Sequence, residues 1–99
     1  MTAAGDARSW SPEQVAAAAP SPAALAAARP LSTAASWSRT GCDERAVWGT
    51  YHGTAAEPYD TMVDTVGVGY TCSCPSRRIP CKHALALLLM WIDERVPDA

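Results

Sequence analysis

The spacing of the apolar positions changes along the chain. Through the middle, aromatic and β-branched residues fall at nearly alternate positions, and glycine, proline and acidic residues interrupt them. Alternation of this kind is typical of half-buried strands. It predicts three strands at about 46–53, 58–65 and 68–73, joined by hairpin-type turns, with the glycines of DTVGVG in the second turn.

A helix is predicted to follow, from about Cys81 or Lys82 to Arg95. Nearly every face of it carries apolar side chains, namely Leu85, Leu88, Leu89 and Ile92 on one side and Leu87 and Trp91 on the other. A helix that is apolar all round is buried on more than one side. We therefore expect the strands to cover one side of this helix and the N-terminal part of the chain to cover the other.

Alanine, proline and serine dominate the first forty residues, where two short helices are predicted. Ser11 and Ser21 are the expected N-caps, a proline follows each of them at the first helical position, and Pro20 and Pro30 end the helices. Alanine favours helix but offers little apolar area for burial. A loosely docked arm is therefore the alternative for this segment.

Together these elements predict an α+β fold. It combines a small three-stranded antiparallel sheet with one C-terminal helix, and the short alanine-rich helices precede them. The chain is divided into a helical segment, residues 1–40, and a second domain, residues 41–99. A domain of roughly 50 to 60 residues has a marginal core, so we expect a metal or disulfide staple.

Composition narrows the function classes. The 99 residues carry a formal net charge of -2 with a pI near 5.5, which excludes a globally basic nucleic-acid binder and leaves a local basic patch open. No secretory signal is visible, and the longest apolar run, Ala84 to Ile92, is far shorter than the about 20 residues that span a membrane. We expect a cytoplasmic protein with reduced thiols. The abrupt end after the best helix suggests a piece of a longer protein.

The densest chemistry lies in YTCSCPSRRIPCKHALALLLMW, where potential ligands are spaced as Cys72-x-Cys74-x(6)-Cys81-x-His83. In a strand, residues i and i+2 point to the same face, so Cys72 and Cys74 can address one ion. The PSRRIP loop brings Cys81 and His83 back at the helix start, where the macrodipole favours thiolate. Three thiolates and one imidazole suit a tetrahedral structural zinc site.

Disulfides, a catalytic nucleophile and an ordinary half-buried histidine are the alternatives to a metal. Disulfides leave the histidine unexplained and need an oxidising compartment. Cys74 or Cys81 as a nucleophile with His83 as its base needs an orienting group and a cleft, and the sequence clearly supplies neither. Cys42 and His52 could support the metal site or act as alternative ligands. We prefer the simpler interpretation, in which Cys42 is a surface-loop cysteine and His52 is a strand histidine.

The charge of the expected metal site also matters. Three thiolates, one imidazole and Zn²⁺ sum to about -1. Arg77, Arg78 and Lys82 lie in or beside the loop and would offset that charge. The same three cations are the candidate contacts to nucleic-acid phosphates.

The run C-x-C-P-x(5)-C-K-H at residues 72–83, with an apolar helix behind it, resembles the SWIM zinc-finger family. That family's pattern is C-x-C-x(n)-C-x-H on a β–β–α scaffold. The resemblance implies that Cys72, Cys74, Cys81 and His83 are zinc ligands. WSPEQV, AVWGTYHGTAAEPY and CSCPSRRIPCKHALALLLMW extend the likeness to a bacterial, mainly actinobacterial, group of longer SWIM proteins.

The resemblance implies a module that contacts DNA or proteins and is not an enzyme. Family domains occur in Swi/Snf-type ATPases, Mutator-type transposases and ubiquitin-ligase-like proteins. The candidate partners are thus DNA and proteins, with no membrane and no small-molecule substrate, and a purely protein-binding module of a larger multidomain protein is the alternative. The four tryptophans could serve a protein contact, although we expect Trp48 and Trp91 to fill the core.

Overall fold

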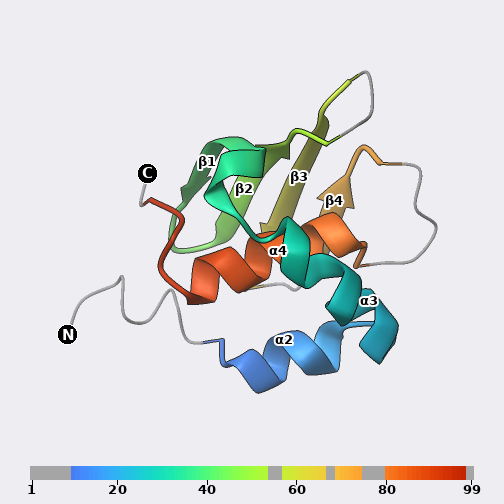
Figure 1. The fold of residues 1–99 in the computed structure, drawn as a ribbon. Helices are drawn as coiled ribbons and strands as arrows, with labels where there is room; N and C mark the ends of the chain where they lie inside the picture. The colour runs from blue at the N-terminus through green and yellow to red at the C-terminus, as the bar shows by residue number, and fades with distance from the viewer. Residues whose placement is uncertain (1–9, 54–56, 67–68, 75–79, 98–99) are drawn as a thin grey trace.

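The computed structural model describes residues 10–53, 57–66, 69–74 and 80–97 (Figure 1). Its centre is an antiparallel sheet of four strands in the order β1-β2-β3-β4. The strands are β1 (Trp37–Cys42), β2 (Ala46–Tyr51), β3 (Tyr59–Asp64) and β4 (Gly69–Cys72). Strands that are neighbours in the chain are also neighbours in the sheet, so each connection is short and local.

The α+β class is confirmed, but the prediction of three strands is wrong, because β1 precedes them. The sequence of β1, WSRTGC, lacks the apolar alternation that marks a strand. This strand forms through its pairing with β2, in which Trp37 lies opposite Tyr51 and the register shifts between Ser38 and Gly41. It also crosses the boundary predicted between residues 40 and 41.

One helix, α4 (Lys82–Ile92), crosses the sheet and supplies seven of the fifteen buried apolar residues in the described part of the chain. It packs on β2, β3 and β4 with one side and on the N-terminal helices with the other, so the expected burial on two sides is confirmed. The helix ends before Arg95 because Glu94 adopts the left-handed conformation (φ 59°), as residues that follow a helix often do. Within the described residues, no helix has the length and apolar character of a membrane span.

Two short helices, α2 (Pro12–Ala18) and α3 (Pro22–Ala28), begin as predicted at a serine that is followed by a proline. The hydroxyl oxygens of Ser11 and Ser21 each accept a hydrogen bond from the backbone N–H three residues on, at 3.2 and 3.1 Å. These bonds satisfy amides for which the first turn offers no intrahelical partner. The helix starts could therefore be read directly from the sequence.

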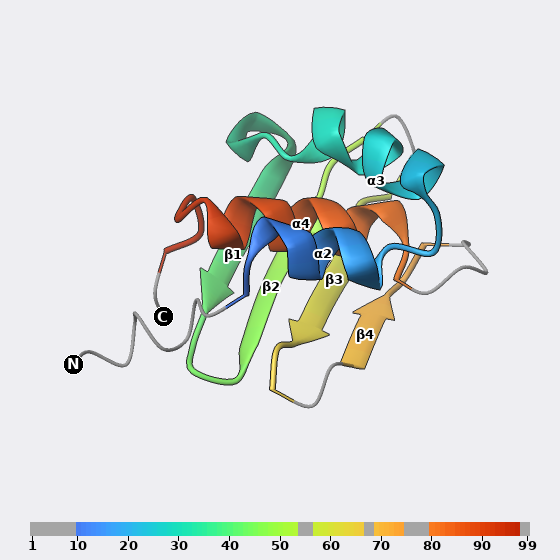
Figure 2. The ribbon, with the colours of Figure 1, turned by 90° about the horizontal axis from the view of Figure 1, so that it is seen from below.

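The helices α2 and α3 pack on the side of α4 that faces away from the sheet, as Figure 2 shows. Val15 and Ala28 are fully buried, so this segment belongs to the core and is not a loosely docked arm. The chain continues past the predicted end at Pro30 as the 3₁₀ turn η1 (Arg29–Leu31), because proline fits the first turn of a helix. A second 3₁₀ turn, η2 (Ala34–Ser36), leads into β1.

The residues after α4 return to β1. The Pro97 carbonyl accepts a hydrogen bond from the Cys42 N–H at 3.0 Å, and the Cys42 thiol donates to the same oxygen at 3.6 Å. Cys42 is 1% exposed, and Val96 in the returning segment is also buried. The interpretation of Cys42 as a surface-loop cysteine is therefore wrong, because the C-terminal segment covers it.

The tryptophans lie on both faces of the sheet. Trp37 and Trp91 are buried on the face that α4 covers. Trp48, which we expected in the core, is half-buried and lines a hollow on the opposite face. The reason is strand alternation: Val47 and Gly49, its neighbours in β2, are the buried residues, so Trp48 points the other way.

Gly49 of β2 lies close against side chains of β1. A Cβ added there would lie 2.9 Å from Thr40 Cγ2 and 2.9 Å from Trp37 Cε3. We expect Gly49→Ala to lower the free energy of unfolding by about 1–3 kcal/mol, as overpacking of a core does. Urea denaturation measures this loss. Gly69→Ala is the matched control, because its Cβ would meet only Asp64 Cβ, at an ordinary 3.7 Å; an equal loss in both variants would contradict the steric explanation.

Candidate metal centre

Four potential ligands meet where β4 ends and α4 begins. Cys72 is the last residue of β4 and Cys74 follows it, while Cys81 is the N-cap of α4 and His83 lies in its first turn. Alternation turns Cys72 toward α4, together with the half-buried Tyr70. Cys81 and His83 are buried, whereas Cys72 and Cys74 are half-buried at this edge of the sheet.

The ligand atoms of Cys72, Cys74, Cys81 and His83 all lie within 4.8 Å of one another. Nδ1 of His83 is 3.9 Å from Cys72 Sγ and 4.0 Å from Cys81 Sγ. A tetrahedral zinc ion, with bonds of about 2.3 Å to sulfur and about 2.0 Å to nitrogen, places its ligand atoms about 3.5–3.8 Å apart. The observed spacing is slightly wider, so a small contraction would let the four side chains hold one ion.

Cys72 and Cys81 interact through a hydrogen bond between their side chains. The Cys81 thiol donates to Cys72, which is the main reason why the pKa of Cys72 lies well below its usual range. The same hydrogen bond, together with burial, raises the pKa of Cys81. The hydrogen bond thus favours thiolate at Cys72, and a metal ion that binds here displaces protons from the cysteines because thiolate is the ligand form of cysteine.

Residues 59–92 of the chain match the family model described as the SWIM zinc finger. The chain contains a SWIM zinc finger. The matched segment runs through β3, β4 and α4 and includes all four clustered side chains, so zinc is the cofactor that the family and this donor set identify. No curated protein and no solved structure matches the chain significantly.

Side chains from β2 and β3 surround the cluster of the SWIM finger. Thr61 is 3% exposed, and its Oγ1 lies 3.1 Å from Cys72 Sγ, within hydrogen-bond distance. The His83 ring contacts both Tyr51 and Tyr59, with ring centroids 4.8 and 4.9 Å away. Such contacts orient one sulfur and the imidazole, as supporting residues of metal sites do.

These three supporting residues of the SWIM finger were not predicted from the sequence. Tyr51 and Tyr59 face each other across β2 and β3, and that pairing depends on a register which the sequence does not display. Thr61 has a visible signal, since it is a polar residue at an inward position of β3, in phase with the buried Val63. A buried polar side chain normally has a hydrogen-bond partner, and here the partner is Cys72.

The other residues singled out in the sequence lie elsewhere. Cys42 and His52 do not belong to the cluster found among the described residues. His52 is exposed just after β2, and its Nε2 lies 2.5 Å from a serine hydroxyl of β1. Lys82 is exposed at the first position of α4. Arg77 and Arg78 fall outside the described residues.

We expect Thr61→Val to weaken zinc binding about 10-fold while the fold stays intact. Valine keeps the branched shape but removes the hydroxyl beside Cys72 Sγ, and supporting hydrogen bonds to metal ligands typically change affinity by about 10–100-fold. Competition with a chromophoric chelator at neutral pH measures the affinity. Thr61→Ser, which retains the hydroxyl, is the control. An unchanged affinity in the valine variant would show that the hydroxyl does not support the site.

Proposed function

We propose that the SWIM finger is a non-catalytic binding module whose zinc ion is held by Cys72, Cys74, Cys81 and His83. The number of donors supports this most directly, because four side chains from the end of β4 and the start of α4 reach a common point. A catalytic zinc keeps one position open for water, whereas four protein ligands complete the tetrahedron. The ion then fastens a four-residue edge strand to the central helix, and its role is structural.

DNA is one candidate partner of the module. Arg77, Arg78 and Lys82 place three cations within six consecutive sequence positions between Cys74 and His83, which is more than a zinc centre with a charge of about -1 requires. Lys82, the described member of the group, is exposed next to the buried Cys81. Cations grouped in this way can hold phosphates of a nucleic-acid backbone.

The combined substitution Arg77→Ala and Arg78→Ala is expected to abolish DNA binding by the zinc-loaded protein. If the three cations each contact a phosphate, raising the salt from about 50 to about 200 mM should lower the affinity about 40-fold. Fluorescence anisotropy with a labelled duplex measures both effects. Arg95→Ala is the control, because Arg95 pairs with Asp93 beyond the far end of α4. Unchanged binding in the double variant would exclude the loop as a DNA contact.

A purely protein-binding module is the second candidate. Exposed apolar side chains on the sheet face opposite α4 favour it, since Met62 is 45% exposed and Trp48 is half-buried there. The net charge of -2 also disfavours a polyanionic partner. Protein binding that persists at high salt and is lost in Trp48→Ala would favour this candidate over the first.

A further inference from the structure

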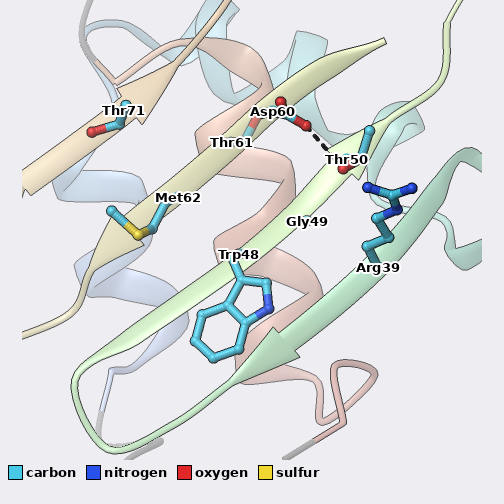
Figure 3. Close-up of a pocket in the computed structure, with 8 residues that line it drawn as sticks. All are labelled: Arg39, Trp48, Gly49, Thr50, Asp60, Thr61, Met62 and Thr71. Atoms are coloured by element: carbon cyan, nitrogen blue, oxygen red, sulfur yellow. Dashed lines mark hydrogen bonds between the residues drawn. The ribbon is translucent and has the colours of Figure 1, made fainter. Parts of the chain in front are cut away.

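One face of the sheet is covered by none of the described elements. The described helices α2, α3 and α4 lie on the other side, where α4 packs on β2, β3 and β4 (Figures 1 and 2). The uncovered face contains a hollow of about 410 Å³ that extends from β1 to β4 (Figure 3). Its floor consists of two neighbouring rows of side chains, one apolar and one charged.

The apolar row consists of Trp48 and Met62, which pair across β2 and β3; the hydroxyl-bearing Thr71, opposite Met62 on β4, lies at its end. Met62 is the most exposed of the large apolar side chains on the sheet, at 45%. The Trp48 indole lies against the backbone of Gly41, where an added Cβ would be 2.8 Å from its Nε1. A flat ring next to a flexible thioether offers an adaptable surface for an apolar group of a partner.

The charged row lies two residues away from the apolar row on the same strands. Thr50 and Asp60 pair across β2 and β3, and the Thr50 hydroxyl donates to Asp60 Oδ1 at 3.0 Å. Arg39 extends this row from β1, and Figure 3 shows its guanidinium beside Thr50. Arg39 is exposed and forms no ion pair with any residue in the described part of the chain.

A backbone irregularity aims Arg39 at the hollow. Trp37 faces α4, so regular alternation would turn Arg39 to that same side. Instead, the register shifts between Ser38 and Gly41, and Arg39 adopts a left-handed conformation with φ 54°. That conformation is unfavourable for a residue with a Cβ, and β-bulges commonly redirect a side chain in this way. The fold thus places beside the apolar row, at a conformational cost, a cation that has no ion-pair partner among the described residues.

We propose that this face binds a protein partner through a segment in which an apolar side chain lies next to an acidic residue. The apolar side chain packs on Trp48 and Met62, and the carboxylate pairs with Arg39, whose planar guanidinium matches a carboxylate with two parallel hydrogen bonds. This inference rests on the proposed binding function and adds to it the surface and the chemistry of the partner.

A peptide fits this face better than a nucleic-acid strand does. Among the described residues that line the hollow, Arg39 is the cation and Asp60 the anion. A strand of phosphates needs several cations, and Asp60 would repel it. A peptide has N–H groups that can donate hydrogen bonds to the Asp60 carboxylate, and it can also carry an acidic side chain that pairs with Arg39.

The test uses the zinc-loaded full chain and a phage-displayed library of random peptides. We expect the enriched peptides to place an aromatic or aliphatic residue beside Asp or Glu. Synthetic copies of these peptides should bind the Arg39→Asn and Met62→Glu variants about tenfold more weakly than the wild type. Fluorescence anisotropy measures these affinities. Asparagine tolerates the left-handed conformation, and Met62 is exposed, so both variants should fold. Arg29→Ala, which removes an exposed cation outside the hollow, is the control and should bind as the wild type does.

Circular dichroism and zinc content of each variant separate the possible failures. If the variants fold, hold zinc and bind the peptides as the wild type does, or if no peptide of this kind is enriched, the docking face is wrong, while the zinc-stabilised module stands. If no peptide binds and Trp48→Ala abolishes binding of a labelled oligothymidylate, the occupant is a nucleic-acid strand and the peptide proposal falls. If the fold and the peptide binding both survive removal of zinc, the docking face stands and the structural role of zinc falls.

Discussion

Replacing His83 with alanine is expected to release the zinc ion and to unfold most of residues 46–95. Structural zinc supplies roughly 10 kcal/mol or more of apparent free energy in small fingers, and a small domain has a total stability of about 5–15 kcal/mol. The substitution also removes a ring that is 4% exposed and contacts Tyr51 and Tyr59. Cys74→Ser should have a similar effect, because the serine hydroxyl does not replace a thiolate as a zinc ligand.

Elemental analysis of the reduced protein and far-ultraviolet circular dichroism measure the two parts of this result. Chelation of the wild-type protein should produce the same loss of signal as His83→Ala. His52→Ala is the control, because His52 is exposed and lies outside the ligand cluster. Native secondary structure in a zinc-free sample would show that the metal is an accessory to a fold that the apolar core already stabilises.

The second large effect concerns Trp91, which is fully buried. Its ring packs edge-on against Trp10, with centroids 6.3 Å apart, so it joins α4 to the start of the N-terminal helices. We expect Trp91→Ala to lower the free energy of unfolding by about 3–5 kcal/mol, because it leaves a large cavity between α4 and its neighbours. Urea denaturation of the zinc-loaded protein gives this value.

A phenylalanine variant separates the volume of Trp91 from its polar atom. The indole N–H of Trp91 has no hydrogen-bond partner among the described residues. Trp91→Phe therefore removes no hydrogen bond, and it replaces a buried donor that lacks a partner with an apolar ring. It should lower the free energy of unfolding much less than Trp91→Ala does. Similar losses in the two variants would mean that the indole N–H has a partner, and a loss under about 1 kcal/mol in the alanine variant would contradict the cavity argument.

The ligand cluster could be predicted from the sequence because its geometry is local. Cys72 and Cys74 are two residues apart where a strand ends, and Cys81 and His83 are two apart where a helix starts, so each pair converges through backbone geometry alone. Only the loop between the pairs has to return the chain. The same locality explains the helix starts, where a serine and the proline after it define the first turn.

Features that depend on strand pairing could not be predicted in this way. β1 has few strand-forming residues and forms because β2 offers a partner edge, so the sequence of β1 alone gives no signal. Trp48 is an example. The sequence of β2 shows that its side chains alternate between two faces, but packing decides which set of alternate residues faces α4. Thr61 meets Cys72 across β3 and β4, a contact fixed by the register of two separate strands.

The helix α4 begins with two residues of the ligand cluster and ends next to Trp10, through Trp91. Metal binding and the docking of α2 and α3 therefore both involve this helix. Consider a molecule that binds the N-terminal helices and changes how they pack on α4. If its binding changes the affinity for zinc by some factor, zinc binding changes the affinity for that molecule by the same factor. Any coupling between the alanine-rich side of the molecule and the metal site at the sheet edge therefore acts equally in both directions.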